Sequence, residues 1–138
     1  MLIPYKANHD KIAMGLVSYI DKFKDLKALT QEMDRIKTGK RKAYLWRDEE
    51  TDNIVGLIAF DISADDEVLI IRYLTINPSF RGESLSYAML SALADEFPEC
   101  SISGGLALSD LLNKWAVHEQ RTQPNIVTPP AGDETNES

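Results

Sequence analysis

Hydrophobic residues recur with the period of a helix in the first part of the chain. Residues 2–5 predict a short strand, which Pro4 confines to a sheet edge or a strand start. Asn8 or Asp10 can cap the helix that follows. One face of that helix is apolar and consists of Ile12, Leu16, Tyr19 and Ile20, with Ala13 and Val17 beside them.

A second helix is predicted from about Lys24 to Lys37. Its apolar residues follow one another at steps of three or four and are Leu26, Leu29, Met33 and Ile36. The other faces are charged, so we expect an amphipathic surface helix. The basic run at residues 37–42 is interpreted as its solvated end, where positive charge complements the helix dipole.

The period then changes to that of strands. Strands are predicted at residues 43–47, 54–62 and 67–76, with polar turns between them at 48–53 and 63–66. The third strand is the most apolar stretch of the chain, which favours a central strand covered on both faces. The short turns indicate antiparallel pairing.

The last third of the chain predicts two helices, a strand between them and a weak strand at the end. These are a helix from about Ser84 to Phe97, a strand at 100–103 with a turn at Gly104 and Gly105, a helix at 108–119 and a strand at 125–127. The element order is therefore β-α-α-β-β-β-α-β-α-(β). It predicts an α/β (α+β) mixed sheet with helices on both faces.

Length and charge narrow the class of protein. The chain has 138 residues, which predicts a single domain over 1–127 and a disordered polar tail over 128–138. Acidic residues outnumber basic ones 22 to 15. This balance argues against a nucleic-acid partner and leaves room for a cationic or neutral small molecule. There is no apolar run long enough for a membrane helix and no cleavage signal, so we expect no membrane partner and a cytoplasmic protein.

The metal-binding and nucleophilic residue types are sparse. Cys100 is the single cysteine, and His9 and His118 lie far apart without ligand spacing, so no metal site is predicted. Cys100 is interpreted as a small core residue. Trp46 and Trp115 are interpreted as core or rim aromatics.

The most informative segment is the third strand with the loop and helix after it, LIIRYLTINPSFRGESLSYAMLSALADEF. The buried strand ends at Asn77-Pro78, a loop with Gly82 follows, and a helix begins at once. Free N–H groups and the dipole at a helix N-terminus attract anions, and Arg81 adds a cationic donor. The segment therefore suits a pyrophosphate, although a strand–turn–helix with one glycine is also common without a ligand.

The stretch L-T-I-N-P-S-F-R-G-E-S-L-S and the order of elements resemble the GCN5-related N-acetyltransferases (GNAT). The resemblance covers residues 2–120. Within that family, the N-terminal stretch and the short length look most similar to RibT-type proteins of bacterial riboflavin operons. The resemblance implies that acetyl-coenzyme A is the co-substrate and that an amine of a small molecule or protein is the acceptor. Many relatives are dimers, so the resemblance implies a homodimer.

The family uses R/Q-x-x-G-x-G/A to hold the pyrophosphate of acetyl-coenzyme A and the preceding strand to pair with the pantetheine arm. Carried over by position, the cofactor-binding residues are Leu74, Thr75, Ile76, Arg81, Gly82, Glu83, Ser84, Leu85 and Ser86. Ser84 and Ser86 stand where the family has glycine or alanine. A left-handed backbone at a serine would cost about 1–2 kcal/mol, so the site is either adapted or degenerate.

At the positions where the resembled family carries its catalytic side chains, this sequence has other residue types. The catalytic residues are therefore unknown. Leu112 stands where relatives often carry a tyrosine acid, and Gly105 lies close to the position of a family asparagine. Asp61, Glu67 and Tyr73 are interpreted as structural or solvated.

Three functions follow from these observations. The first is acetyl-coenzyme A-dependent N-acetylation of an amine. The alternative is a catalytically degenerate protein of the same fold that acts as a coenzyme A-binding regulatory or interaction module. A third is a small interaction domain unrelated to acyl transfer.

Overall fold

The hydrophobic strands pair into one sheet of six strands in a computed structural model, which describes residues 1–80, 82–121 and 124–127. The strands stand in the sheet in the order of the chain: β1 (Leu2–Pro4), β2 (Lys42–Arg47), β3 (Ile54–Ile62), β4 (Val68–Ile76), β5 (Ser101–Gly105) and β6 (Asn125–Val127). Neighbours from β1 to β4 are antiparallel, whereas β5 is parallel to both β4 and β6. The predicted mixed sheet is confirmed. The predicted disordered tail, 128–138, lies outside the described residues.

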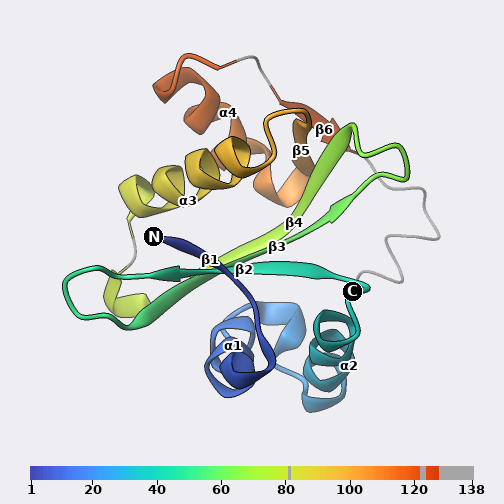
Figure 1. Ribbon diagram of the computed structural model, residues 1–138, viewed down its shortest axis with the longest axis vertical. Helices are drawn as coiled ribbons and strands as arrows, with labels where there is room; N and C mark the ends of the chain where they lie inside the picture. The colour runs from blue at the N-terminus through green and yellow to red at the C-terminus, as the bar shows by residue number, and fades with distance from the viewer. Residues whose placement is uncertain (81, 122–123, 128–138) are drawn as a thin grey trace.

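Two layers of helices cover the sheet, one on each face (Figure 1). Helices α1 (Asp10–Val17) and α2 (Leu26–Lys37) lie on one face, and α3 (Glu83–Glu96) and α4 (Ser109–His118) lie on the other. The carboxylate of Asp25 caps α2 by accepting from the N–H of Ala28 at 3.0 Å. The predicted arrangement of helices on both faces is therefore confirmed.

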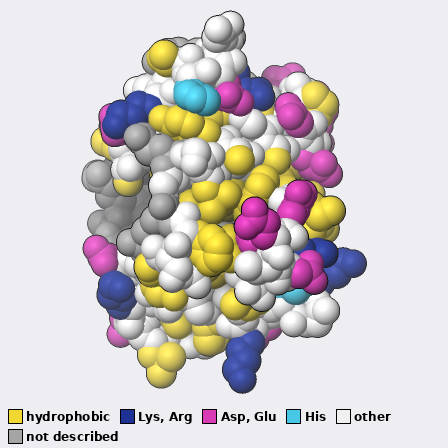
Figure 2. Space-filling view, turned by 90° about the vertical axis from the view of Figure 1, so that its left-hand side faces the viewer, with side chains coloured by type: hydrophobic (Ala, Val, Ile, Leu, Met, Phe, Trp, Pro, Cys, Tyr) yellow, Lys and Arg dark blue, Asp and Glu magenta, His cyan; other side chains and the backbone are white. Residues whose placement is uncertain are grey.

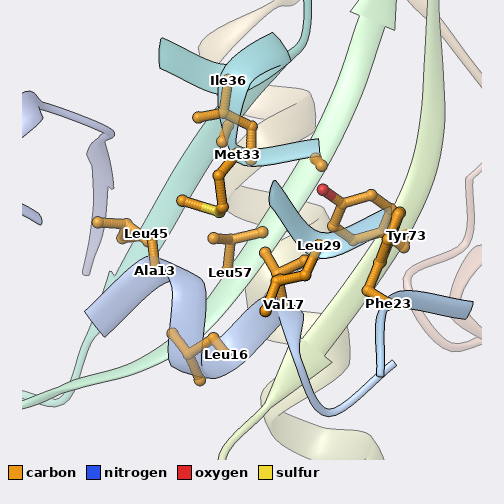
Figure 3. Close-up of a cluster of buried hydrophobic side chains, with 12 residues drawn as sticks. Ala13, Leu16, Val17, Phe23, Leu29, Met33, Ile36, Leu45, Leu57 and Tyr73 are labelled. Carbon is orange, nitrogen blue, oxygen red and sulfur yellow. The ribbon is translucent and has the colours of Figure 1, made fainter. Parts of the chain in front are cut away.

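Alternate strand residues point to opposite faces, so each layer has its own core. Figure 3 shows the core under α1 and α2, where Leu45, Leu57 and Tyr73 project from the sheet towards the helices. The other core lies under α3 and α4 and contains mainly aliphatic and aromatic side chains, including Phe60, Leu69, Ile71, Met89, Leu93, Leu112 and Trp115.

The third predicted strand, which is β4 in the structure, is less completely buried than its apolar sequence predicts. Its side chains alternate between buried and half-buried in β4, whereas β3 is buried without a break from Val55 to Phe60. The strand covered most completely on both faces is thus β3. It lies between β2 and β4, under both helical layers.

The first two helices also differ from the sequence pattern. Helix α1 ends at Val17, so Tyr19 and Ile20 lie beyond it. Leu26 is 73% exposed because it is the first residue of α2 and lies before the buried stripe begins. The basic run after α2 is not wholly solvated, because Arg41 is buried and pairs with Glu32 and Asp61.

The predicted turn at Gly104 and Gly105 is the end of β5 instead. Gly104 pairs with Ile71 and lies so close to α4 that a Cβ there would come within 2.5 Å of Leu112. A glycine at this position allows the last helix to pack on the strand. Cys100 is half-buried and packs against the core beneath α3 and α4, and its Sγ lies 3.1 Å from the carbonyl oxygen of Asp66. Of the two tryptophans, Trp115 is buried and Trp46 is half-buried.

Candidate functional site

β4 runs on past its pairing with β5. The parallel pairs extend from Val68 with Ser101 to Ile71 with Gly104. Beyond that point, the pairing with β3 shifts register and continues to Ile76. The edge of β4 at Leu74 and Thr75 is therefore not covered by β5. A sheet that opens in this way leaves room for an extended ligand beside the strand.

A cleft of about 430 Å³ lies at this end of β4. Its walls come from the segment after α1, the end of β4, the start of α3 and the side of α4; the lining residues are Tyr19, Ile20, Leu74, Thr75, Ile76, Gly82, Ser86 and Leu111. Five of the predicted site residues thus share one cleft. Sequence reasoning missed Tyr19, Ile20 and Leu111.

The start of α3 supplies hydrogen-bond donors beside the cleft. Gly82 is the N-cap residue, and its carbonyl oxygen accepts from the N–H of Ser86 at 3.4 Å. The N–H groups of residues 83–85 precede this bond and have no intrahelical acceptor. With the helix dipole behind them, they favour an anion at this end of the cleft. Arg81 and the side chain of Glu83 lie outside the described residues.

The remaining predicted residues of this loop have different surroundings. Ser84 is exposed on the first turn of α3. Leu85 is half-buried and packs against the core beneath α3 and α4, so its side chain contributes to the fold rather than to the wall of the cleft. Only its backbone lies in the anion-attracting turn.

The expected backbone strain at the two serines is absent. Ser84 and Ser86 are both inside α3, whereas the described non-glycine residues with positive φ are Asp52, Asp66 and Gln120. Serine adopts helical dihedrals readily, so the replacement of glycine here does not cost the energy of a left-handed residue. The helix predicted from about Ser84 already contains both serines, so the conditional cost of a left-handed serine does not arise.

Hydrophobic side chains gather across the middle of the face on which the β2–β3 turn and the start of α3 lie (Figure 2). Charged side chains of both signs stand around them.

The described part of the chain has no helix long and apolar enough to span a membrane. In the same residues, no three His, Cys, Asp or Glu side chains come together in a way that could hold a metal ion.

The family model of the acetyltransferase (GNAT) family matches residues 14–120. The chain belongs to this family. An "Uncharacterized N-acetyltransferase in lysA 3′ region" of Bacillus methanolicus is 41% identical over 100 residues, which cover 72% of this chain and 81% of that protein. The predicted enzyme class, an N-acetyltransferase, is confirmed.

Solved structures show the same fold. The ribosomal-protein-alanine N-acetyltransferase of Brucella melitensis biovar Abortus aligns with a TM-score of 0.64 at 12% identity, over 94% of this chain and 96% of that one. An aminoglycoside 6′-N-acetyltransferase complexed with coenzyme A aligns with a TM-score of 0.60 at 14% identity, over 74% of this chain and 60% of that one. At these identities the likeness concerns the fold alone.

The α4 wall of this GNAT cleft carries no acid or base. Leu112, the residue aligned by sequence with the family tyrosine, is fully buried under α4. The neighbouring Leu111 is the α4 residue that lines the cleft. Of the other sequence candidates, Asp61 pairs with Arg41 and Arg72 and is a structural residue. Burial, and then nearby acidic residues, raise the pKa of the Cys100 thiol, which disfavours a nucleophilic thiolate.

Behind β4 of this GNAT fold, a buried carboxylate joins α2 to β4 and to the segment between α2 and β2. Glu32 of α2 is fully buried; its carboxylate accepts from the hydroxyl of Tyr73 at 2.6 Å, from Arg41 at 3.2 Å and from Arg35 at 2.9 Å. The apolar stripe predicted for this helix did not include Glu32. A signal was present, because Glu32 lies three residues after Leu29 and four before Ile36, on the buried side of the helix.

Proposed function

We propose that this protein is an acetyl-coenzyme A-dependent N-acetyltransferase that binds the cofactor in the cleft at the end of β4. The observation that carries the proposal is the meeting of two features in one cleft. The uncovered edge of β4 at Leu74 and Thr75 and the N-terminal turn of α3 at Gly82 both border it. Family membership supports acetyl transfer at such a site.

The residues present fit the chemistry of coenzyme A. The N–H groups of residues 83–85, together with Arg81, would hold the pyrophosphate. Backbone groups of Leu74, Thr75 and Ile76 would pair with the amides of the pantetheine arm, while Leu74, Ile76 and Leu111 offer an apolar wall. When bound, acetyl-coenzyme A supplies a thioester whose acetyl group is activated for attack by a neutral amine.

Positioning would provide much of the rate enhancement. Holding the amine and the thioester together in one cleft can contribute roughly 7–11 kcal/mol to lowering the barrier. A backbone N–H near Leu74 to Ile76 would stabilise the oxyanion that forms on the acetyl carbonyl. The net charge of −7 favours a cationic or neutral acceptor, and two structural neighbours are named as spermidine and aminoglycoside acetyltransferases.

A second candidate is a regulatory or interaction module that binds coenzyme A without transferring the acetyl group. The apolar side chain of Leu111 on the α4 wall favours it, since that wall offers no proton donor. The kinship with RibT-type proteins, a cytoplasmic location and a homodimer stay predictions, and none of them names the acceptor.

Calorimetric titration with acetyl-coenzyme A and coenzyme A tests the cofactor site directly. We expect micromolar binding of both, weakened at least tenfold in Arg81→Ala. Lys27→Ala, which removes an exposed positive charge from α2, is the matched control and should bind as the wild type does. A lack of binding up to millimolar concentration would overturn the proposal. Binding without acetylation of any member of a broad amine panel would favour the regulatory module.

A further inference from the structure

A phenol lies among the described residues that line the cleft. Of those residues, Tyr19 carries a phenolic O–H, and the others are apolar, glycine, or the alcohols Thr75 and Ser86. Resting on the proposed function, we propose that Tyr19 is the general acid that protonates the departing thiolate of coenzyme A. The proton would thus come from the segment after α1, across the cleft from α4.

The backbone of Tyr19 is fixed to the strand beside which the thioester would lie. The carbonyl oxygen of Leu16 accepts from the hydroxyl of Thr75 at 2.9 Å and also from the N–H of Tyr19 at 3.2 Å. A single oxygen atom therefore connects Tyr19 to β4. Since Thr75 is only 5% exposed, this connection is protected from water.

The other polar side chains of the cleft are less suited to the task. The Thr75 hydroxyl already donates to Leu16, so its proton is committed to the fold. An aliphatic alcohol such as Ser86 is a far weaker acid than a phenol. Tyr19 is 39% exposed and lines the cleft, so its side chain is not enclosed in the core.

The reaction step balances as follows. The neutral amine nitrogen attacks the acetyl carbon, the new C–N bond forms, and the C–S bond breaks with its electron pair moving to sulfur. Tyr19 gives its phenolic proton to that sulfur, so that coenzyme A leaves as a thiol. The proton lost by the amine returns to the phenolate through water, and the products are the acetamide and coenzyme A.

The test needs no acceptor, because a phenol that protonates the thiolate also donates a hydrogen bond to it. Dissociation constants for coenzyme A and acetyl-coenzyme A are measured by calorimetry between pH 6.5 and 9. Of the two ligands, only coenzyme A has an ionisable thiol. Protein groups whose titration changes both affinities equally do not change the ratio of the two affinities, so the pH dependence of that ratio reports on the thiol. If Tyr19 lowers the pKa of the bound thiol by about one unit, the preference for coenzyme A rises about sevenfold over this range.

Tyr19→Phe keeps the ring and removes the hydroxyl, so we expect it to bind both ligands while its affinity ratio stays flat with pH. Tyr44→Phe is the control, because Tyr44 lies in the aromatic cluster with Phe60 and Phe97 and should retain the wild-type rise. An equal rise in Tyr19→Phe, or a flat ratio in the wild type, would overturn the role of Tyr19 while the cofactor site stands. Failure of the wild type to bind either ligand would overturn both proposals.

Discussion

The hydroxyl of Tyr73 in β4 donates a 2.6 Å hydrogen bond to Oε2 of Glu32 in α2, 41 positions earlier in the chain. Both residues are buried, and the same carboxylate also pairs with Arg35 and Arg41. The bond lies next to the register shift in β4, just after the last residue that pairs with β5. Glu32 therefore holds β4 from behind at the point where the strand separates from β5.

Replacing Glu32 tests how much this anchor contributes. Glu32→Gln removes one of the two carboxylates that pair with the buried guanidinium of Arg41 and leaves Asp61 as the other, so we take the cost of weakening buried hydrogen bonds, about 1–3 kcal/mol. We expect a loss of that size in the free energy of unfolding, measured with urea. Asp34→Asn, on the exposed side of the same helix, should change it by less than about 0.5 kcal/mol. Equal effects of the two substitutions would contradict the assigned role of Glu32.

Tyr73 predicts a dependence of stability on alkaline pH. Burial, followed by the charge of Glu32 and the hydrogen bond to it, raises the pKa of Tyr73 above its ordinary value of 10. Above pH 10 the unfolded chain therefore loses this proton while the folded chain keeps it, and stability falls by up to about 1.4 kcal/mol per pH unit. Below pH 10 the contribution is fully present. Tyr73→Phe should lower stability at pH 7 and lose less between pH 10 and 11, which urea unfolding at each pH measures.

The two glycines at the end of β5 predict opposite outcomes for the same substitution. Gly104→Ala places a methyl group 2.5 Å from Leu112 of α4, and such overpacking costs typically 1–3 kcal/mol. Gly105→Ala meets nothing within 4 Å and serves as the matched control. Thermal unfolding should show a clear fall in Tm for Gly104→Ala and almost none for Gly105→Ala. The reverse order would mean that the contact with Leu112 is not limiting.

The helical position of Ser84 predicts that restoring a glycine there does not relieve strain. Ser84→Gly should lower the free energy of unfolding by about 0.5 kcal/mol, because glycine disfavours a helix. Ser84→Ala should be neutral or slightly stabilising. Urea unfolding of the two variants compares them directly. A more stable Ser84→Gly would indicate a strained serine after all.

Thr75 predicts a coupling between β4 and the end of α1. Thr75→Val is close in shape to the native residue but removes the hydroxyl that donates to the Leu16 carbonyl, and it leaves that carbonyl with the backbone N–H groups of Ser18 and Tyr19. We expect a loss of about 0.5–1.5 kcal/mol in the free energy of unfolding. Hydrogen exchange of the Tyr19 amide should quicken at the same time. Unchanged exchange at Tyr19 would show that the segment after α1 is held by other contacts.

Periodicity predicted the fold well, because it depends on which residues are apolar. The order of elements, the mixed sheet and the two helical layers all follow from such patterns. The errors arose where a tertiary contact overrides a local preference. Glycines usually signal a turn, yet Gly104 ends a strand because α4 packs too close for any side chain.

The candidate site was predicted only where its residues follow one another in the chain. Leu74 to Ile76 and the loop after them form one continuous motif, and five of its residues line one cleft. Tyr19 comes from a distant segment, and its place depends on the bond between Thr75 and Leu16. The sequence pattern did not reveal that Glu32 is buried, because a glutamate is seldom buried unless several donors surround it. Arg41 and Tyr73 supply these donors from other parts of the chain.

The strands stand in the sheet in the same sequence as in the chain. No strand has to insert between two others that have already paired, so the sheet can grow at one edge as the polypeptide leaves the ribosome. Short turns join the strands of the antiparallel unit from β2 to β4. Because each pair of strands encloses only a short loop, pairing costs little chain entropy, which favours early folding of this unit. β5 and β6 would attach afterwards, because a helix separates each of them from the strand before it. The cleft beside β4 would thus be completed last in synthesis, when α4 settles against Gly104.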